Sequence, residues 1–95
     1  MALTVVARIT AVAGEEEALR QALEALVAPT RAEAGCLQYD LHRDNDAPGV
    51  FLFFEIWESR ALWQDHMAAP HILAHRAATG EMVADVALHE MTRIA

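Results

Sequence analysis

Basic residues, cysteine and long apolar runs are all scarce in this sequence. It contains no lysine, and seven arginines stand against 14 aspartates and glutamates, which gives a formal net charge of −7. Binding to nucleic acid or to an anionic membrane surface depends on a basic face, so we expect neither as a partner. The single cysteine, Cys36, excludes an internal disulfide and a cysteine-rich metal or iron–sulfur site.

Several functional motifs are missing as well. The four glycines are scattered and form no loop that could hold a phosphate or a dinucleotide. No serine, histidine and acidic residue follow the spacing of a hydrolase nucleophile elbow. The chain begins without a basic segment, and it has no run of the ~18 apolar residues that a membrane span requires. We therefore expect a cytoplasmic protein.

The pattern of apolar residues predicts four strands and three helical segments. Strands are expected over 3–11, 36–43, 50–58 and 84–94, and helices over 15–33, from the N-cap Ser59 to 67, and over 71–82. Pro29 falls inside the first helical segment and is expected to kink or divide it. The order β-α-β-β-α-β predicts one ferredoxin-like α+β domain over 1–95, with a four-stranded antiparallel sheet in the order 4-1-3-2.

The third expected strand carries apolar side chains on both of its faces: Leu52, Phe54 and Ile56 on one, and Phe51, Phe53 and Trp57 on the other. A strand of this kind belongs to a sheet that is covered on both sides. Helices can cover one side, and the rest of the chain is too short to cover the other. We therefore infer a second copy of the protein and expect a homodimer.

Two reactive side chains have structural explanations. Glu55 stands alone among the apolar residues of the third strand. A cross-strand partner such as Arg8 accounts for it, and we prefer this interpretation to a catalytic role. Cys36 lies at the start of a strand, where inert burial is expected.

Three of the five histidines, His66, His71 and His75, lie within ten residues. His71 and His75 are one helical turn apart and share a face, whereas Pro70 separates them from His66. Histidine takes and releases a proton near neutral pH. The cluster therefore suits proton transfer in a pocket between helix and sheet, with aromatic side chains as the lining.

The same histidines allow two other interpretations. His66, at the end of its helix, can interact with the helix dipole in a purely structural role. His71 and His75 can share a cation, but Ile72 stands where a metalloprotease motif has glutamate. No carboxylate or cysteine lies at a convincing spacing for a third ligand, so we expect no metal site.

Three stretches of the sequence together resemble a known family. They are residues 34–44, with Gly-Cys-Leu-Gln-Tyr near the centre, residues 54–59, Phe-Glu-Ile-Trp-Glu-Ser, and residues 66–71, His-Met-Ala-Ala-Pro-His. In this order and spacing they resemble the antibiotic biosynthesis monooxygenase (ABM) family, and they look closest to its small, quinol-monooxygenase-like branch. The resemblance covers nearly the whole chain, and it implies a dimeric α+β barrel of two ferredoxin-like subunits.

The resemblance also implies a reaction. Family members include oxygenases that use no metal, flavin or haem, and that act with O₂ on electron-rich polycyclic phenols or hydroquinones after a base removes the phenolic proton. It implies catalytic roles for two histidines and substrate contacts for four further residues: His66 and His71, and Tyr39, Phe53, Trp63 and His75.

Other activities of the same family are alternatives. Haem-degrading members use an Asn–Trp–His set, but the first strand here has no asparagine and His66 stands at the position expected for tryptophan. Haem degradation is therefore not expected. Other relatives isomerise small signalling molecules with histidines on the same helix. An isomerase of a small hydroxy-ketone and a non-catalytic dimeric binder of a small aromatic ligand are thus the two alternatives to an oxygenase.

Overall fold

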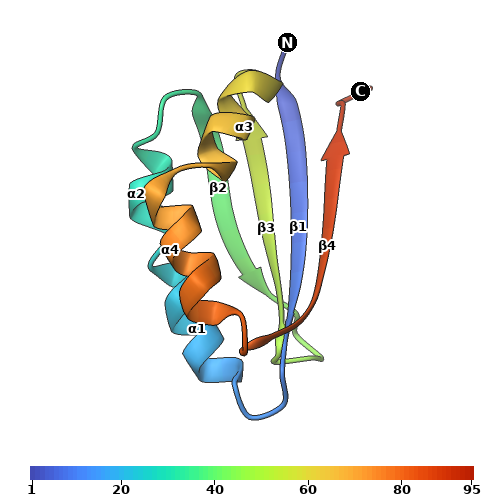
Figure 1. Ribbon diagram of the computed structural model, residues 1–95. Helices are drawn as coiled ribbons and strands as arrows, with labels where there is room; N and C mark the ends of the chain where they lie inside the picture. The colour runs from blue at the N-terminus through green and yellow to red at the C-terminus, as the bar shows by residue number, and fades with distance from the viewer.

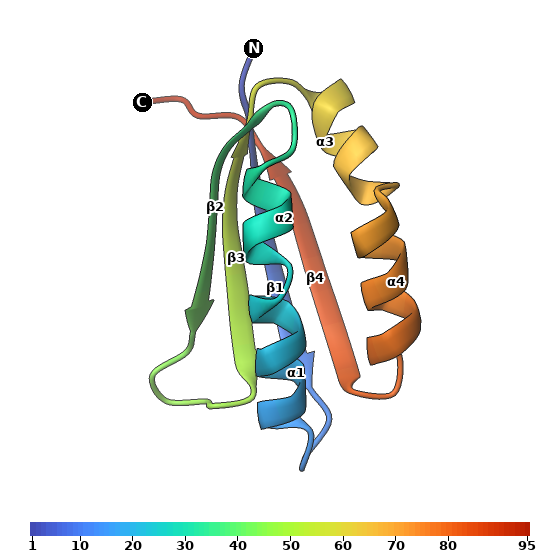
Figure 2. The same ribbon diagram turned by 90° about the vertical axis from the view of Figure 1, so that its left-hand side faces the viewer.

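All the helices of the protein lie on one face of a single antiparallel sheet (Figures 1 and 2). The computed structural model describes residues 1–95 and gives the strand order β2-β3-β1-β4, which confirms the predicted order and the ferredoxin-like fold. None of the helices is long and apolar enough to cross a lipid bilayer. The elements are β1 (Leu3–Ala11), α1 (Glu16–Glu24), α2 (Val27–Arg31), β2 (Cys36–Arg43), β3 (Val50–Trp57), α3 (Arg60–Met67), α4 (Pro70–Thr79) and β4 (Val83–Met91).

The first predicted helix is divided into α1 and α2, and Pro29 accounts for the division. Proline has no N–H to donate, and its ring clashes with the carbonyl four residues earlier, which here belongs to Ala25. The interruption falls at Ala25 and Leu26. The N–H of Leu26 bonds to the carbonyl of Leu23, only three residues back, at 3.1 Å. The proline therefore lies in the second helix and disturbs the turn before it.

The break between α3 and α4 comes from Pro70. Ser59 caps α3 as predicted, because its Oγ accepts a hydrogen bond from the N–H of Leu62 at 3.2 Å. Pro70 opens α4, and Ala69 before it is extended, with ψ at 146°, because proline disfavours the helical conformation of its predecessor. α4 ends at Thr79 instead of 82, and the turn that follows leads directly into β4.

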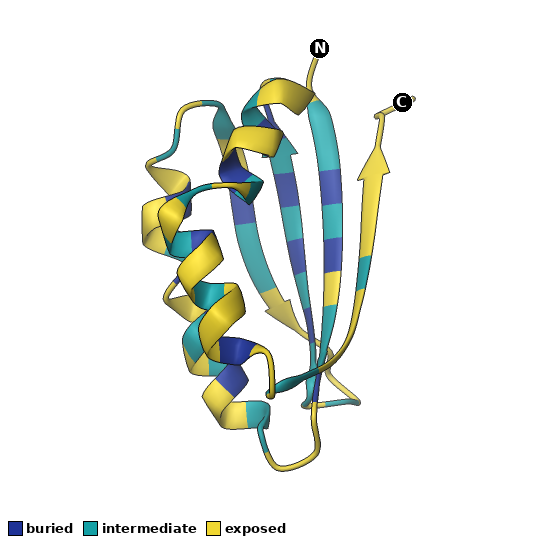
Figure 3. Ribbon diagram, in the orientation of Figure 1, coloured by how far each residue is buried: buried dark blue, intermediate teal, exposed yellow.

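Alternation along β3 directs one set of its side chains toward the helices. Phe51, Phe53, Glu55 and Trp57 are all buried (Figure 3), and Val5 of β1 lies opposite Glu55 in the register of the two strands. Burying a large apolar side chain contributes about 1.5–3 kcal/mol. The core therefore lies between the sheet and the helices, and a single carboxylate is buried in it.

The opposite face of the sheet carries no helix (Figure 1). Its apolar side chains come from the other alternation of the central strands, with Val6 on β1 and Leu52, Phe54 and Ile56 on β3. These four residues are only half-buried. Val6 lies directly opposite Phe54, so the two central strands present a continuous apolar strip on the uncovered face.

Candidate active site

A cavity of about 370 Å³ lies between the sheet and the helices. This volume is typical of sites that bind small molecules. All four strands and the helices α1, α3 and α4 contribute to its mostly apolar lining. It is bordered on one side by β4, where Val86 and Leu88 are 56% and 42% exposed. The few polar groups in the lining belong to Tyr39, Glu55, His66, His75, Arg76 and Thr79.

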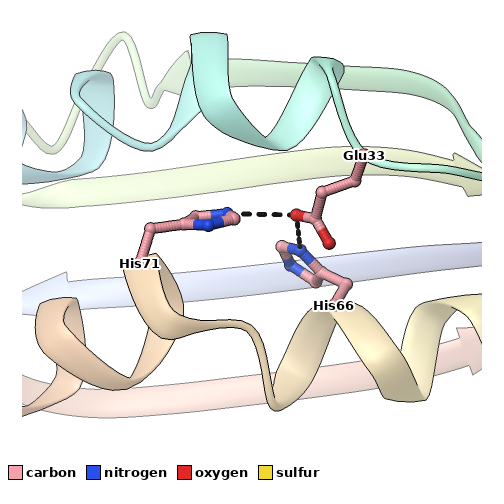
Figure 4. Close-up of side chains that lie close together, drawn as sticks. All are labelled: Glu33, His66 and His71. Carbon is pink, nitrogen blue, oxygen red and sulfur yellow. Dashed lines mark hydrogen bonds and ion pairs between the residues drawn. The ribbon is translucent and has the colours of Figure 1, made fainter.

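His66 and His71 converge on one carboxylate, that of Glu33 (Figure 4). Nδ1 of His66 lies 2.6 Å from Oε2 of Glu33, and Nε2 of His71 lies 3.0 Å from the same oxygen. Glu33 follows α2 in the turn to β2, and Gly35 completes this turn with φ at +84°, a conformation that favours glycine. The two histidines lie on either side of the break at Pro70, which brings both of them toward the turn.

The contact with Glu33 determines how His66 is protonated. A carboxylate only accepts hydrogen bonds, so Nδ1 of His66 donates its proton to Glu33. Burial lowers the pKa of His66, while the hydrogen bond to Glu33 opposes this effect. In the neutral ring Nε2 carries no proton, and the chain provides it with no hydrogen-bond partner. His66 lines the cavity, and Nε2 is its one unprotonated nitrogen.

Aromatic contacts fix the ring of His66. Its exposed fraction is 3%, its ring centroid lies 4.6 Å from that of Trp57, and it meets the ring of Tyr39 edge-on at 5.7 Å. Tyr39 in turn stacks on Phe53 at 4.5 Å. Both of these predicted substrate contacts are buried and line the cavity. Burial and the neighbouring Glu55 raise the pKa of the Tyr39 phenol, which keeps it uncharged.

The remaining predicted site residues lie in different places. His75 lines the cavity, and burial followed by the charge of Arg76 lowers its pKa. His71 does not line the cavity, and its Nε2 lies beside Glu33 and 3.2 Å from the Thr30 hydroxyl. Trp63 is buried outside the lining, and its indole Nε1 has no hydrogen-bond partner.

The expected partner of Glu55 was wrong. Arg8 is paired with Leu52, so alternation along β1 directs it to the uncovered face, whereas Glu55 points toward the helices. The carboxylate of Glu55 instead accepts a hydrogen bond from Nε1 of Trp57 at 2.9 Å. Burial raises the pKa of Glu55 to about 7, although the bond from Trp57 acts in the opposite direction. The cavity therefore contains a carboxyl group that can hold its proton near neutral pH.

Sequence reasoning missed the role of Glu33 entirely. It is 33 residues away from His66 along the chain, in a turn, and no spacing pattern connects the two. Glu55 carried a signal, because it interrupts an apolar alternation that points toward the core. Together, these residues give the cavity a neutral base on His66 and a proton-bearing acid on Glu55.

Comparisons with known proteins match most of the chain to one family. A model of the antibiotic biosynthesis monooxygenase family matches residues 2–78. The Mycobacterium tuberculosis protein named "Putative monooxygenase Rv0793" is 40% identical over 81 residues, which cover 85% of this chain and 79% of that protein. The structure of Rv0793 matches with a TM-score of 0.93 at 35% identity, over 100% of this chain and 97% of that one. The crystal structure of PA3566 from Pseudomonas aeruginosa matches with a TM-score of 0.95 at 41% identity, over 99% of this chain and 95% of that one.

Proposed function

The chain belongs to the antibiotic biosynthesis monooxygenase family, and from this premise we propose that it oxidises a small aromatic quinol or polycyclic phenol with O₂, without a cofactor. One observation carries the proposal. His66 lines an apolar cavity while Glu33 occupies its Nδ1, which leaves the unprotonated Nε2 as the nitrogen available to a substrate. Such a nitrogen can act as a general base toward a phenolic proton.

The proposed reaction begins when Nε2 of His66 takes the phenolic proton. The imidazolium that forms is stabilised by the carboxylate of Glu33, as in other histidine–carboxylate pairs. The phenolate gives one electron to O₂, and a C–O bond then forms at a ring carbon that bears hydrogen, para to the phenolate oxygen in a phenol and ortho to it in a hydroquinone. Protonation by His66 gives a ring hydroperoxide. It loses water made from the outer oxygen, the ring hydrogen and the returned proton, so the net change is phenol plus O₂ to quinone plus water.

The other residues of the cavity support this chemistry. Tyr39 and Phe53 form a stacked aromatic wall against which a flat substrate ring can pack. His75 provides a further polar contact from α4. His71 acts through Glu33, because it lies 3.0 Å from the carboxylate that orients His66. Trp63 lies outside the lining, so the proposal gives it no contact with substrate.

The proposal is tested by oxygen uptake with the purified protein and a panel of hydroquinones and polycyclic phenols in chelator-treated buffer. We expect uptake above the rate of autoxidation, with one quinone formed per O₂ consumed and ¹⁸O from labelled O₂ in the product. Turnover of a hydroxy-ketone without O₂ would instead favour an isomerase. Saturable binding of an aromatic ligand with no product would favour a binding protein, and either result contradicts the oxygenase.

We also propose that the protein is a homodimer in which a second copy covers the strip of Val6, Leu52, Phe54 and Ile56. These apolar side chains occupy the face that no helix covers, and burying them gains about 25 cal/mol per Å² of apolar surface. The dimeric barrel that the family resemblance implies uses two such sheets.

Light scattering after size exclusion measures this assembly. We expect about 21 kDa, twice the 10.4 kDa of one chain. Phe54→Arg is expected to give monomers, because it places a charge in the strip. Leu73→Arg is the matched control, since Leu73 lies on α4 and is already 51% exposed. A monomeric wild-type protein, or a Phe54→Arg variant that remains dimeric, contradicts the proposed interface.

A further inference from the structure

Glu33, His66 and His71 point one potential ligand atom each at a common position (Figure 4). The three atoms, a carboxylate oxygen and two imidazole nitrogens, lie within 4.8 Å of one another. Two histidines and one carboxylate are a donor set that binds Zn²⁺ and related divalent ions. We propose that these residues bind a divalent transition-metal ion of the zinc class, and that the bound ion prevents His66 from acting as a base.

The histidines supply the fixed part of this site. Nδ1 of His66 and Nε2 of His71 lie 2.6 and 3.0 Å from the same carboxylate oxygen. Zn–N distances are about 2.0–2.1 Å, so both rings must move toward an ion at that position by up to about 1 Å. Packing against Trp57 and Tyr39 holds the ring of His66 in place. His71 comes from the start of α4, across the break at Pro70.

Glu33 supplies the adjustable part. Zinc–ligand distances are about 2.0–2.2 Å, so the ion takes the place that Oε2 of Glu33 now occupies, and the carboxylate must withdraw to bind it from the side. Its position in a turn and its exposed side chain fraction of 18% allow this movement. The nitrogen donors disfavour Mg²⁺ and Ca²⁺, which prefer oxygen ligands.

Metal binding and base catalysis require different forms of His66. Without a metal, Nδ1 carries the proton that Glu33 accepts, and Nε2 is free to act as the base. A neutral imidazole that binds a metal through Nδ1 must carry its proton on Nε2. That nitrogen then donates a hydrogen bond and cannot take a phenolic proton. This consequence rests on the proposed function, whereas the binding of the ion does not.

The binding is tested with chelator-stripped protein that competes for Zn²⁺ with a chromophoric chelator. We expect one ion per chain. His71→Ala removes a half-exposed ligand and is expected to weaken binding by more than about tenfold. His75→Ala removes a histidine outside the cluster and serves as the matched control, with circular dichroism to confirm folding of both. Absence of stoichiometric binding, or equal affinity in His71→Ala and the wild type, overturns the site.

A second measurement separates this inference from the proposed function. If the protein consumes O₂, then Zn²⁺ is expected to stop uptake at one ion per chain, chelator is expected to restore it, and His71→Ala is expected to need a correspondingly higher Zn²⁺ concentration. Uptake that persists with the site filled overturns the block on His66. If no substrate supports uptake, the proposed function fails, and the competition experiment still decides whether the ion binds.

Discussion

Replacing His66 with alanine is expected to lower the rate of oxygen uptake by about 10²- to 10⁴-fold, the usual contribution of a positioned general base. The expectation follows from the contact that fixes Nδ1 to Glu33 at 2.6 Å and leaves Nε2 for the substrate. No other group in the cavity duplicates this arrangement, because Nδ1 and Nε2 of His75 bond to no carboxylate in the chain. The rate at saturating substrate and the KM are measured separately, since loss of a base lowers kcat.

Matched variants distinguish this role from simple loss of structure. His66→Gln retains much of the buried volume and can still donate to Glu33, so it should fold as the wild type and lose a similar factor in kcat. Glu33→Gln keeps the base but removes the carboxylate, so its kcat should fall by a smaller factor than that of His66→Gln. His75→Ala should mainly raise KM. A His66→Gln protein that folds and keeps kcat within threefold of wild type contradicts His66 as the base.

Glu55→Gln is expected to remove a large part of the dependence of stability on pH. The pKa of Glu55 rises from 4.5 to about 7 because the folded protein buries its carboxyl group. The folded state therefore binds this proton more tightly than the unfolded state. The stabilisation of the fold that comes from protonated Glu55 is fully present below pH 4.5. That contribution is lost as pH rises to about 7, and the loss is about 3 kcal/mol before any relaxation of the site.

Chemical denaturation at a fixed protein concentration, at pH 5 and at pH 8, measures this effect. Glutamine cannot ionise, and its amide oxygen can still accept a hydrogen bond from Nε1 of Trp57. The stability of the variant relative to the wild type should therefore rise only at the higher pH. Glu58→Gln is the matched control, because Glu58 is exposed and lies one residue beyond β3. Its stability should change between pH 5 and pH 8 as that of the wild type does. An identical change from pH 5 to pH 8 in Glu55→Gln and the wild type would show that Glu55 does not ionise in this range.

The sequence alone was sufficient for the fold because the signals were local. Alternation along 50–58, the cap at Ser59 and the proline at 70 each act over a few residues, and all of them appear in the structure. The division of the first helix also follows from a local property of Pro29. The ends of the elements were predicted less accurately. α4 ends at 79 instead of 82 and β4 at 91 instead of 94, because turn geometry and pairing with β1 decide these limits.

The site was harder to predict because it depends on register and on turns. Arg8 and Glu55 looked like partners, but the register of β1 on β3 places them on opposite faces. Glu33 gave no signal, because its position depends on where α2 ends and on how Gly35 turns the chain into β2. The three histidines could be named as candidates, but the convergence of His66 and His71 on Glu33 arises only when α2, α3 and α4 pack together.

The placement of Val86 and Leu88 has a consequence for the size of the substrates. Both side chains line the cavity and are also substantially exposed, so the β4 side is where the cavity meets solvent. His66 and Tyr39 are 3% exposed and lie at the enclosed end. A molecule that enters from β4 with its reactive ring first can therefore leave a long substituent outside. The protein then selects substrates by the ring that enters the cavity. Compounds that differ only in the substituent left outside can bind at the same site.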